Sequence, residues 1–206
     1  MFHFGMSCHW RRLSEEQRKE VLEYRIRMKR PWRRPPHFDQ GNTFYHLTGA
    51  CYEHREWIGH SPERMANFCD GLLDAFQSHP GSGIPTAWCV LPNHYHVLVK
   101  TADLKSLVAT LSKLHGRTSF HWNREENCRG RRVWHGVSDR AMRSDSHFWA
   151  TTNYIHHNPV KHGYVARWDE WPFSSATAFL DDVGRDEAVR IWNAFPILDY
   201  GKGWDD

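Results

Sequence analysis

The chain has 206 residues, of which 40% are hydrophobic and 25% charged, which is typical of a globular domain with a hydrophobic core. No apolar run approaches the ~18 residues that cross a membrane, and residues 1–10 lack the apolar core of a signal peptide, so we expect neither a membrane protein nor an exported one. The five cysteines show no Cys-x-x-Cys spacing, which argues against a thiolate zinc site and indicates a reducing cytoplasm.

The net charge of +3 is unevenly distributed along the chain. Residues 11–34 contain ten basic and four acidic side chains, a balance of +6, so the rest of the chain carries −3. Such a run is either a solvated face or an arm that binds phosphates. Ser14 followed by acidic residues predicts the start of a helix, and Pro31, Pro35 and Pro36 follow its end. We interpret residues 1–36 as a basic helical extension with a Pro-rich linker.

The next part of the chain alternates strand and helix patterns. Residues 43–52 and the two halves of a hairpin, 84–91 and 94–100, predict strands. Ser61-Pro62 and Asp103 are caps for two runs whose apolar side chains recur at helical spacing. Residues 132–142 read as a fourth strand, with Val133 and Val137 facing inward.

In chain order these elements are strand, helix, strand, strand, helix, strand. This is the βαββαβ order of a ferredoxin-like or RRM-like α+β sheet. The fold packs two helices on one face of the sheet, so we expect the functional residues on the other, free face.

The C-terminal part predicts further helices. Residues 144–157 form a helical pattern that Asn158-Pro159 should end or kink. The acidic tail, residues 181–206, contains a short helical pattern at residues 186–195. We therefore expect the basic extension (residues 1–36), a central domain with a C-terminal helix (residues 37–180) and the acidic tail (residues 181–206).

Two histidines, His94 and His96, stand two residues apart at the start of the strand predicted for residues 94–100. Since alternate side chains of a strand project from the same face, both imidazoles can bind one divalent cation. With 16 histidines in the chain, chance alone gives roughly one His-x-His pair. The interpretation of this pair as a metal site therefore depends on a second cluster downstream.

In that cluster, Tyr154 and Asn158 share one face of the predicted helix, and His157 borders the same face. A tyrosine with a pKa near ~10 is a poor nucleophile unless a cation stabilises the developing phenolate; the alternative is a tyrosine that only packs on the sheet. His157 and Asn158 compete as a third metal ligand. Asn158 lies about 40° round the helix from Tyr154, and His157 about 60° on the other side. Asn158 offers the oxygen that Mg²⁺ prefers, whereas His157 is the stronger donor for a transition metal.

Two motifs, Pro-Asn-His-Tyr-His at 92–96 and Tyr-Ile-His-His-Asn-Pro-Val at 154–160, resemble those of the REP-associated tyrosine transposases. These are single-tyrosine members of the HUH endonuclease superfamily. Tyr-His-Leu-Thr at 45–48 and Trp-Pro-Phe-Ser-Ser at 171–175 support a resemblance that covers roughly residues 38–180. Family members often have Tyr-Pro-Trp where this chain has Trp-Pro-Phe, an exchange of aromatic residues that leaves the chemistry unchanged.

The resemblance implies a metal-dependent endonuclease and strand transferase of single-stranded DNA. It assigns Mg²⁺ or Mn²⁺ to His94, His96 and Asn158, and makes Tyr154 the nucleophile that yields a 5′-phosphotyrosine and a free 3′-OH. It implies as substrate a palindromic hairpin repeat flanked by a single-stranded guide, and a cytoplasmic, nucleoid-associated protein that is a monomer or a homodimer. The candidate DNA contacts are basic residues: Arg33, Arg34, Arg131, Arg132, Arg140, Arg143 and Lys161.

Two other functions are compatible with this fold. A non-catalytic RRM-like protein would stack bases on aromatic side chains of the free sheet face, where the strand at residues 94–100 instead offers two histidines. A zinc hydrolase would attack with a metal-bound hydroxide in place of Tyr154, and no third strong ligand or carboxylate base is evident near the histidine pair.

Overall fold

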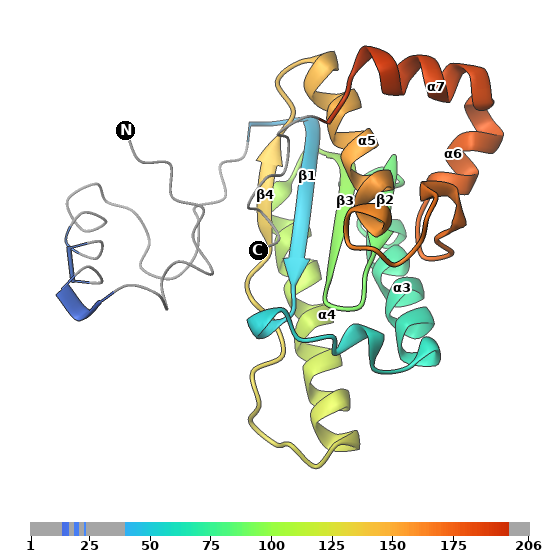
Figure 1. Cartoon of the computed structure of the whole chain (residues 1–206). Helices are drawn as coiled ribbons and strands as arrows, with labels where there is room; N and C mark the ends of the chain where they lie inside the picture. The colour runs from blue at the N-terminus through green and yellow to red at the C-terminus, as the bar shows by residue number, and fades with distance from the viewer. Residues whose placement is uncertain (1–13, 17–18, 21–22, 24–39, 198–206) are drawn as a thin grey trace.

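The computed structural model describes residues 40–197 together with residues 14–16, 19–20 and 23 (Figure 1). The helix expected in the basic extension and the Pro-rich linker lie largely or wholly outside the described residues, as do Arg33, Arg34 and residues 198–206 of the acidic tail. Among the residues that the structure describes, no helix is both long and apolar enough to cross a bilayer.

One antiparallel sheet of four strands organises the described part of the chain, with the strand order β2-β3-β1-β4. One helix connects the first strand to the second, and another connects the third to the fourth, which is the expected order along the chain. The bounds are β1 (Thr43–Ala50), α3 (Pro62–Gln77), β2 (Ala87–Val90), β3 (His94–Thr101), α4 (Leu104–Glu125) and β4 (Ser138–Ala141). Two 3₁₀ turns, Tyr52–His54 and Ile58–His60, lie between β1 and α3.

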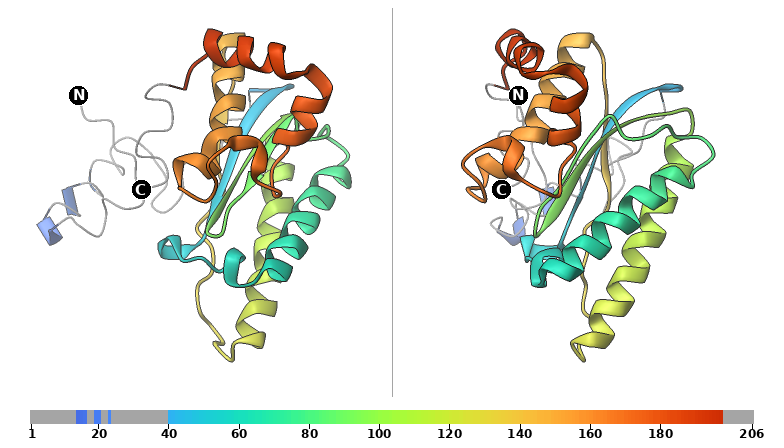
Figure 2. Two further views of the ribbon diagram at one scale, coloured as in Figure 1. Left: turned by 45° about the vertical axis from the view of Figure 1, so that its right-hand side comes forward. Right: turned by 90° about the vertical axis from the view of Figure 1, so that its right-hand side faces the viewer.

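The two connecting helices begin at the expected caps. Ser61 accepts a hydrogen bond from the backbone N–H of Arg64 at the start of α3, and Asp103 accepts one from Ser106 at the start of α4. Both helices cover the same face of the sheet (Figure 2). They bury the apolar stripe expected for α4 against alternate residues of β1 and β3. The main core includes Leu47, Tyr95, Val97, Phe68, Leu72, Phe76, Leu107 and Leu111.

The opposite face of the sheet is not free, and here the prediction was wrong. Helix α5 (Asp145–Lys161) lies across it (Figure 2). Tyr154 and Ile155 of α5 pack on Ala87, Cys89 and Leu98 in a second buried cluster. Because the alternate residues of β2 and β3 on this face are apolar as well as polar, leaving them exposed would cost hydrophobic free energy.

Helix α5 also continues past the point where it was expected to end. Ser144 caps it by accepting from the His147 N–H, and Pro159 lies inside its last turn. Proline removes one N–H donor and crowds the preceding turn, but only two helical residues follow it. The backbone N–H of His162 still donates to the Asn158 carbonyl, at 3.1 Å. Asn158 is therefore helical and keeps its alignment with Tyr154.

Two further predictions need correction. Strand β4 occupies only Ser138–Ala141 of the expected residues 132–142, although Val133 and Val137 are buried as expected. Helix α6 (Ala176–Val183) was not expected, whereas α7 (Arg185–Ala194) matches the short helix predicted in the tail. A 3₁₀ turn, Trp168–Glu170, precedes α6.

The register of the central strands depends on a close contact between Gly49 and Tyr95, which face each other across β1 and β3. A Cβ atom on Gly49 would overlap the ring of Tyr95, which is fully buried and has no room to move. We expect Gly49→Ala to lower the free energy of unfolding by about 1–3 kcal/mol.

The matched control is Gly116→Ala on α4, where nothing lies within 4 Å of an added Cβ atom. This change should stabilise the protein by about 0.5–1 kcal/mol, because alanine favours a helix interior over glycine. Urea denaturation of both variants measures the difference. A Gly49→Ala protein as stable as the wild type would contradict the packing described here.

Candidate functional site

The two histidines of the predicted pair lie between the sheet and α5. His94 and His96 project from β3 toward the helix, and His46 and Thr48 of β1 occupy the same face. Across the strands Thr48 faces His96, and Ala50 faces His94. Both predicted histidines are buried, at 1% and 0% exposure, so any ligand at this site meets them inside a sheet–helix interface.

His94 is held between two asparagines. Its Nδ1 lies 2.6 Å from Asn93 Oδ1, and its Nε2 lies 3.2 Å from Asn158 Oδ1. The Asn93 amide is fixed in orientation, because its Nδ2 donates to the His54 carbonyl at 3.1 Å. His94 Nδ1 therefore carries the proton that it donates to Asn93. In a neutral ring, Nε2 then presents its lone pair toward Asn158 Oδ1.

This arrangement fits a bound cation. Two electron-pair donors that face each other are bridged favourably by a metal ion, and adjacent ligands of a six-coordinate Mg²⁺ lie about 3 Å apart. The 3.2 Å between His94 Nε2 and Asn158 Oδ1 matches that spacing. Among residues 40–197 and the few described before them, no cluster of three or more His, Cys, Asp and Glu side chains could hold a metal. The Asn158 amide oxygen is the further donor that the structure places beside His94.

His96 is oriented by β1. Its Nδ1 lies 3.1 Å from His46 Nε2 and 3.0 Å from Thr48 Oγ1. A hydrogen bond donated by Nδ1 to either acceptor leaves the lone pair on Nε2, the tautomer required for metal binding through that atom. Sequence reasoning included His46 and Thr48 in a family motif but gave them no role. The signal that could have found them is their i, i+2 spacing in a strand beside the histidine pair.

Tyr154 lies directly over this cluster and is 1% exposed. Its ring meets His96 edge-on with 5.2 Å between the ring centres, and His46 with 6.0 Å. Lys161, one of the candidate DNA contacts, holds its Nζ 5.3 Å from the centre of the Tyr154 ring. The Tyr154 phenol is thus surrounded by the Lys161 ammonium group and by the imidazoles of His46 and His96.

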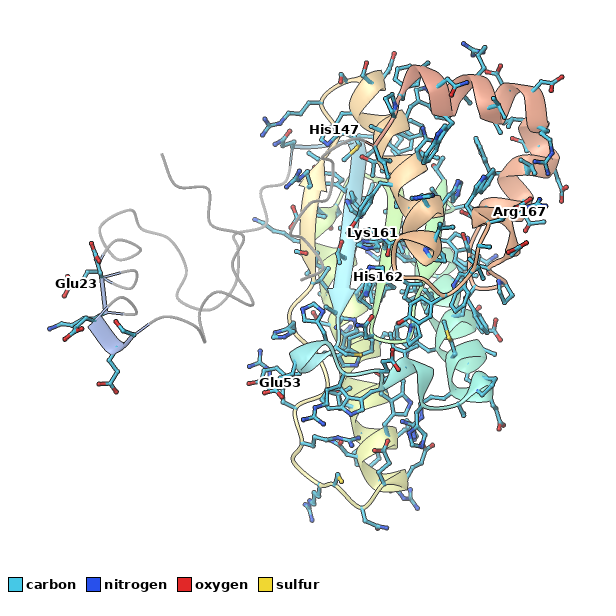
Figure 3. The ribbon with its side chains drawn as sticks, in the orientation of Figure 1. Glu23, Glu53, His147, Lys161, His162 and Arg167 are labelled. Carbon is cyan, nitrogen blue, oxygen red and sulfur yellow. The ribbon has the colours of Figure 1, made fainter. Side chains whose placement is uncertain are left out.

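One residue that sequence reasoning missed is His162, which follows Asn158 by one helical turn. Its ring centre lies 5.1 Å from that of His94. Figure 3 shows Lys161 and His162 together at the C-terminal end of α5. The expectation that the helix ends at residue 157 hid the i, i+4 spacing that places His162 on this face.

The rival ligand His157 points away from the histidine pair. Its ring packs against Trp192 of α7, with 5.1 Å between the centres. The neighbouring His156 is also turned away, since its Nε2 lies 2.9 Å from Ser175 Oγ. Of the two candidates for a third ligand, the structure brings only Asn158 to His94.

The candidate DNA contacts divide into separate groups. Arg131 is held internally, because it pairs with Glu126 at 2.6 Å and donates to Asn123 Oδ1 at 2.9 Å. The hydrogen bond from Arg131 is the main cause that lowers the Glu126 pKa to about 2. Arg132 lies over the ring of Tyr52, at 4.5 Å. The remaining described candidates are exposed at β4, at the loop that follows it and at the end of α5: Arg140, Arg143 and Lys161.

The fold is similar to that of a solved protein. A solved REP-associated tyrosine transposase bound to a REP hairpin superposes with a TM-score of 0.56 at 20% identity, covering 74% of this chain and 86% of that one. This likeness extends over most of both chains and shows a shared fold.

The sequence comparisons point to the same family. The chain is 29% identical to the REP-associated tyrosine transposase of Escherichia coli (strain K12) over 123 residues, 57% of this chain and 66% of that protein. A Haemophilus influenzae protein named for the same family is 29% identical over 127 residues, 54% of this chain and 68% of that protein. The aligned part spans about two thirds of the length of these relatives. No family model matches the chain. The resemblance to REP-associated tyrosine transposases is confirmed.

The burial of His156 should make the free energy of unfolding depend on pH. Desolvation lowers the pKa of its imidazole to about 3, against about 6.5 in an unfolded chain. Between these values the unfolded state binds more protons, so the free energy of unfolding falls as the pH drops from about 6.5 toward 3, by at most about 1.4 kcal/mol per pH unit. Above pH 6.5 this contribution is complete.

Urea denaturation at pH 7 and pH 5 tests this expectation. His156→Gln should flatten the loss of stability between the two pH values, whereas His60→Gln, which changes an exposed histidine, should leave it unchanged. Equal losses for His156→Gln and the wild type would show that another group determines the acid sensitivity.

Proposed function

We propose that this protein is a metal-dependent single-stranded DNA endonuclease and strand transferase that acts at palindromic hairpin repeats through a 5′-phosphotyrosine. The observation that carries the proposal is the placement of Tyr154 against His96 while Asn158, one turn further along α5, reaches His94. The names of the relatives, and the REP hairpin bound to the solved one, support the choice of substrate. The proposed scaffold is a ferredoxin-like βαββαβ domain over residues 37–180, in a cytoplasmic monomer or homodimer.

In this proposal His94 Nε2, His96 Nε2 and Asn158 Oδ1 hold Mg²⁺ or Mn²⁺. The ion, when bound, would supply polarisation of a phosphate oxygen. The chain's own contribution is to present these donors in fixed orientations. Asn93 orients His94, and His46 with Thr48 orients His96, and such outer partners commonly control metal affinity.

Tyr154 supplies the covalent chemistry. Its hydroxyl oxygen forms a bond to phosphorus as the bond from phosphorus to the 3′ oxygen breaks; the phenol loses its proton and the leaving oxygen takes one up. The products are a 5′-phosphotyrosine and a free 3′-OH. Attack by another 3′-OH reverses these bonds, regenerates Tyr154 and joins the strands. Because Tyr154 is 1% exposed, its hydroxyl has to become accessible before it attacks the DNA.

The two alternatives have less support. Base stacking in the manner of an RRM requires an open sheet face, and α5 covers the face that carries the histidines. A zinc hydrolase requires strong ligands or a carboxylate base at the pair, whereas within the described residues His94 faces the amide oxygen of Asn158.

The tyrosine mechanism predicts that Tyr154→Phe abolishes cleavage while folding and DNA binding persist, because only the attacking oxygen is removed. Incubation with hairpin-flanked single-stranded DNA and Mn²⁺, followed by a denaturing gel, detects both the cut strand and the covalent adduct. Tyr164→Phe is the matched control, since the Tyr164 hydroxyl bonds Glu56 outside the site, at 3.0 Å. Substantial cutting by Tyr154→Phe would sink the tyrosine mechanism and favour hydrolysis by activated water.

The metal ligands make a separate prediction. Asn158→Ala should lower Mg²⁺-dependent cleavage at least about tenfold and weaken Mn²⁺ binding measured by calorimetry without DNA. His157→Ala should do much less, since that ring packs on Trp192. If His157→Ala has the larger effect on both measurements, the third ligand is His157 and a softer metal is favoured.

A further inference from the structure

A stacked group of side chains lies at the end of β1, next to the proposed site. The guanidinium carbon of Arg132 lies 4.5 Å from the centre of the Tyr52 ring. The ring of His135 packs on Tyr52 with 5.0 Å between centres and an angle of 43°. Arg132 is exposed, and Tyr52 and His135 are half-buried. A flat cation supported by aromatic rings is therefore presented at the surface.

Backbone hydrogen bonds hold this group in place. Tyr52 N–H donates to the Val133 carbonyl at 2.7 Å, and His135 N–H donates to the Ala50 carbonyl at 2.8 Å. The Arg132 side chain is itself oriented, because its Nε donates to the Trp134 carbonyl at 3.3 Å. Among the residues that the structure describes, Arg132 makes no ion pair, in contrast to its neighbour Arg131. No carboxylate in this described part of the chain therefore neutralises its positive charge.

The backbone beside Tyr52 is strained. Glu53 and His54 both have positive φ, at 61° and 52°, a conformation that non-glycine residues rarely adopt. Two contacts retain it: Glu53 N–H donates to His135 Nε2 at 3.3 Å, and Asn93 Nδ2 donates to the His54 carbonyl at 3.1 Å. Strain of this kind persists where surrounding contacts determine the backbone, and it clusters at ligand sites.

Asn93 joins this group to the proposed catalytic site, since the same amide contacts His94 Nδ1 at 2.6 Å. Ala50 lies opposite His94 in the sheet, and Tyr52 follows Ala50 by two residues, about 7 Å in an extended chain. Stacked nucleotides rise by about 3.4 Å each, so the separation corresponds to about two nucleotides.

We propose that Arg132, backed by Tyr52, is a stacking platform for a base of single-stranded DNA near the phosphate cleaved by Tyr154. Arginine planes and aromatic rings stack on bases of any sequence, and the charge of Arg132 also attracts the phosphates. This inference rests on the proposed function, because it places the DNA by reference to His94 and Tyr154.

The test is equilibrium binding of a fluorescent hairpin-flanked single-stranded DNA to the full chain, without added metal. Arg132→Ala and Tyr52→Ala should each weaken binding about 5- to 100-fold. Tyr52→Phe should stay within about twofold of the wild type, because the ring that supports Arg132 remains. Arg132→Lys should recover only part of the loss, since lysine keeps the charge but not the plane. Arg129→Ala, which removes an exposed arginine three residues away, should have little effect.

An abasic scan of the DNA, carried out with the wild type and with Arg132→Ala, separates stacking from phosphate contact. One abasic position near the cleavage site should weaken wild-type binding and leave Arg132→Ala binding unchanged. If every abasic position weakens the two proteins equally, or none matters, there is no platform. If the wild type binds the DNA and Arg132→Ala and Tyr52→Ala bind it equally well, this inference is wrong and the proposed function is unaffected. Failure of the wild type to bind such DNA overturns the proposed function, and this inference with it.

Discussion

The packing of α5 on the sheet determines what this molecule can do, because every group in the proposed chemistry belongs to one side or the other of that interface. The strands contribute His46, His94 and His96, and the helix contributes Tyr154 and Asn158. Such an interface buries polar groups, which is costly unless each is hydrogen-bonded. Hydrogen bonds to Asn93 and Thr48 offset part of that cost, and Leu98, Cys89 and Ile155 supply the hydrophobic contact.

The C-terminal segment holds α5 in place from its outer side. Asn153 donates to the Phe195 carbonyl at 2.9 Å, and His157 packs on Trp192 of α7. Ser175 bonds both His156 and the backbone of β2 at Trp88. The two histidines that precede Asn158, His156 and His157, are thus structural residues of the helix, because their rings contact Ser175 and Trp192 and not the histidine pair.

The sequence allowed the scaffold to be predicted because β-strand and helix periodicities are local, and the caps at Ser61 and Asp103 mark the helices that the structure shows. The meeting of Asn158 with His94 could be anticipated from strand alternation and helix spacing, combined with the family motifs; the metal set of His94, His96 and Asn158 stays a proposal. The packing of α5 on the second face of the sheet could not be predicted, since it depends on contacts between distant segments of the chain. Pro159 indicated a helix end, yet Asn158 is helical in the structure, so the position of His162 beside His94 was missed.

Strand alternation gives β3 two separate tasks. Tyr95, Val97 and Val99 belong to the core beneath α3 and α4, whereas His94, His96 and Leu98 face α5. Substitutions on one side can therefore accumulate during evolution with little effect on the other. The deletion of a single residue within β3 would instead exchange the two sets, placing imidazoles in the core and a tyrosine in the site. Insertions and deletions in β3 should consequently be tolerated less well than substitutions.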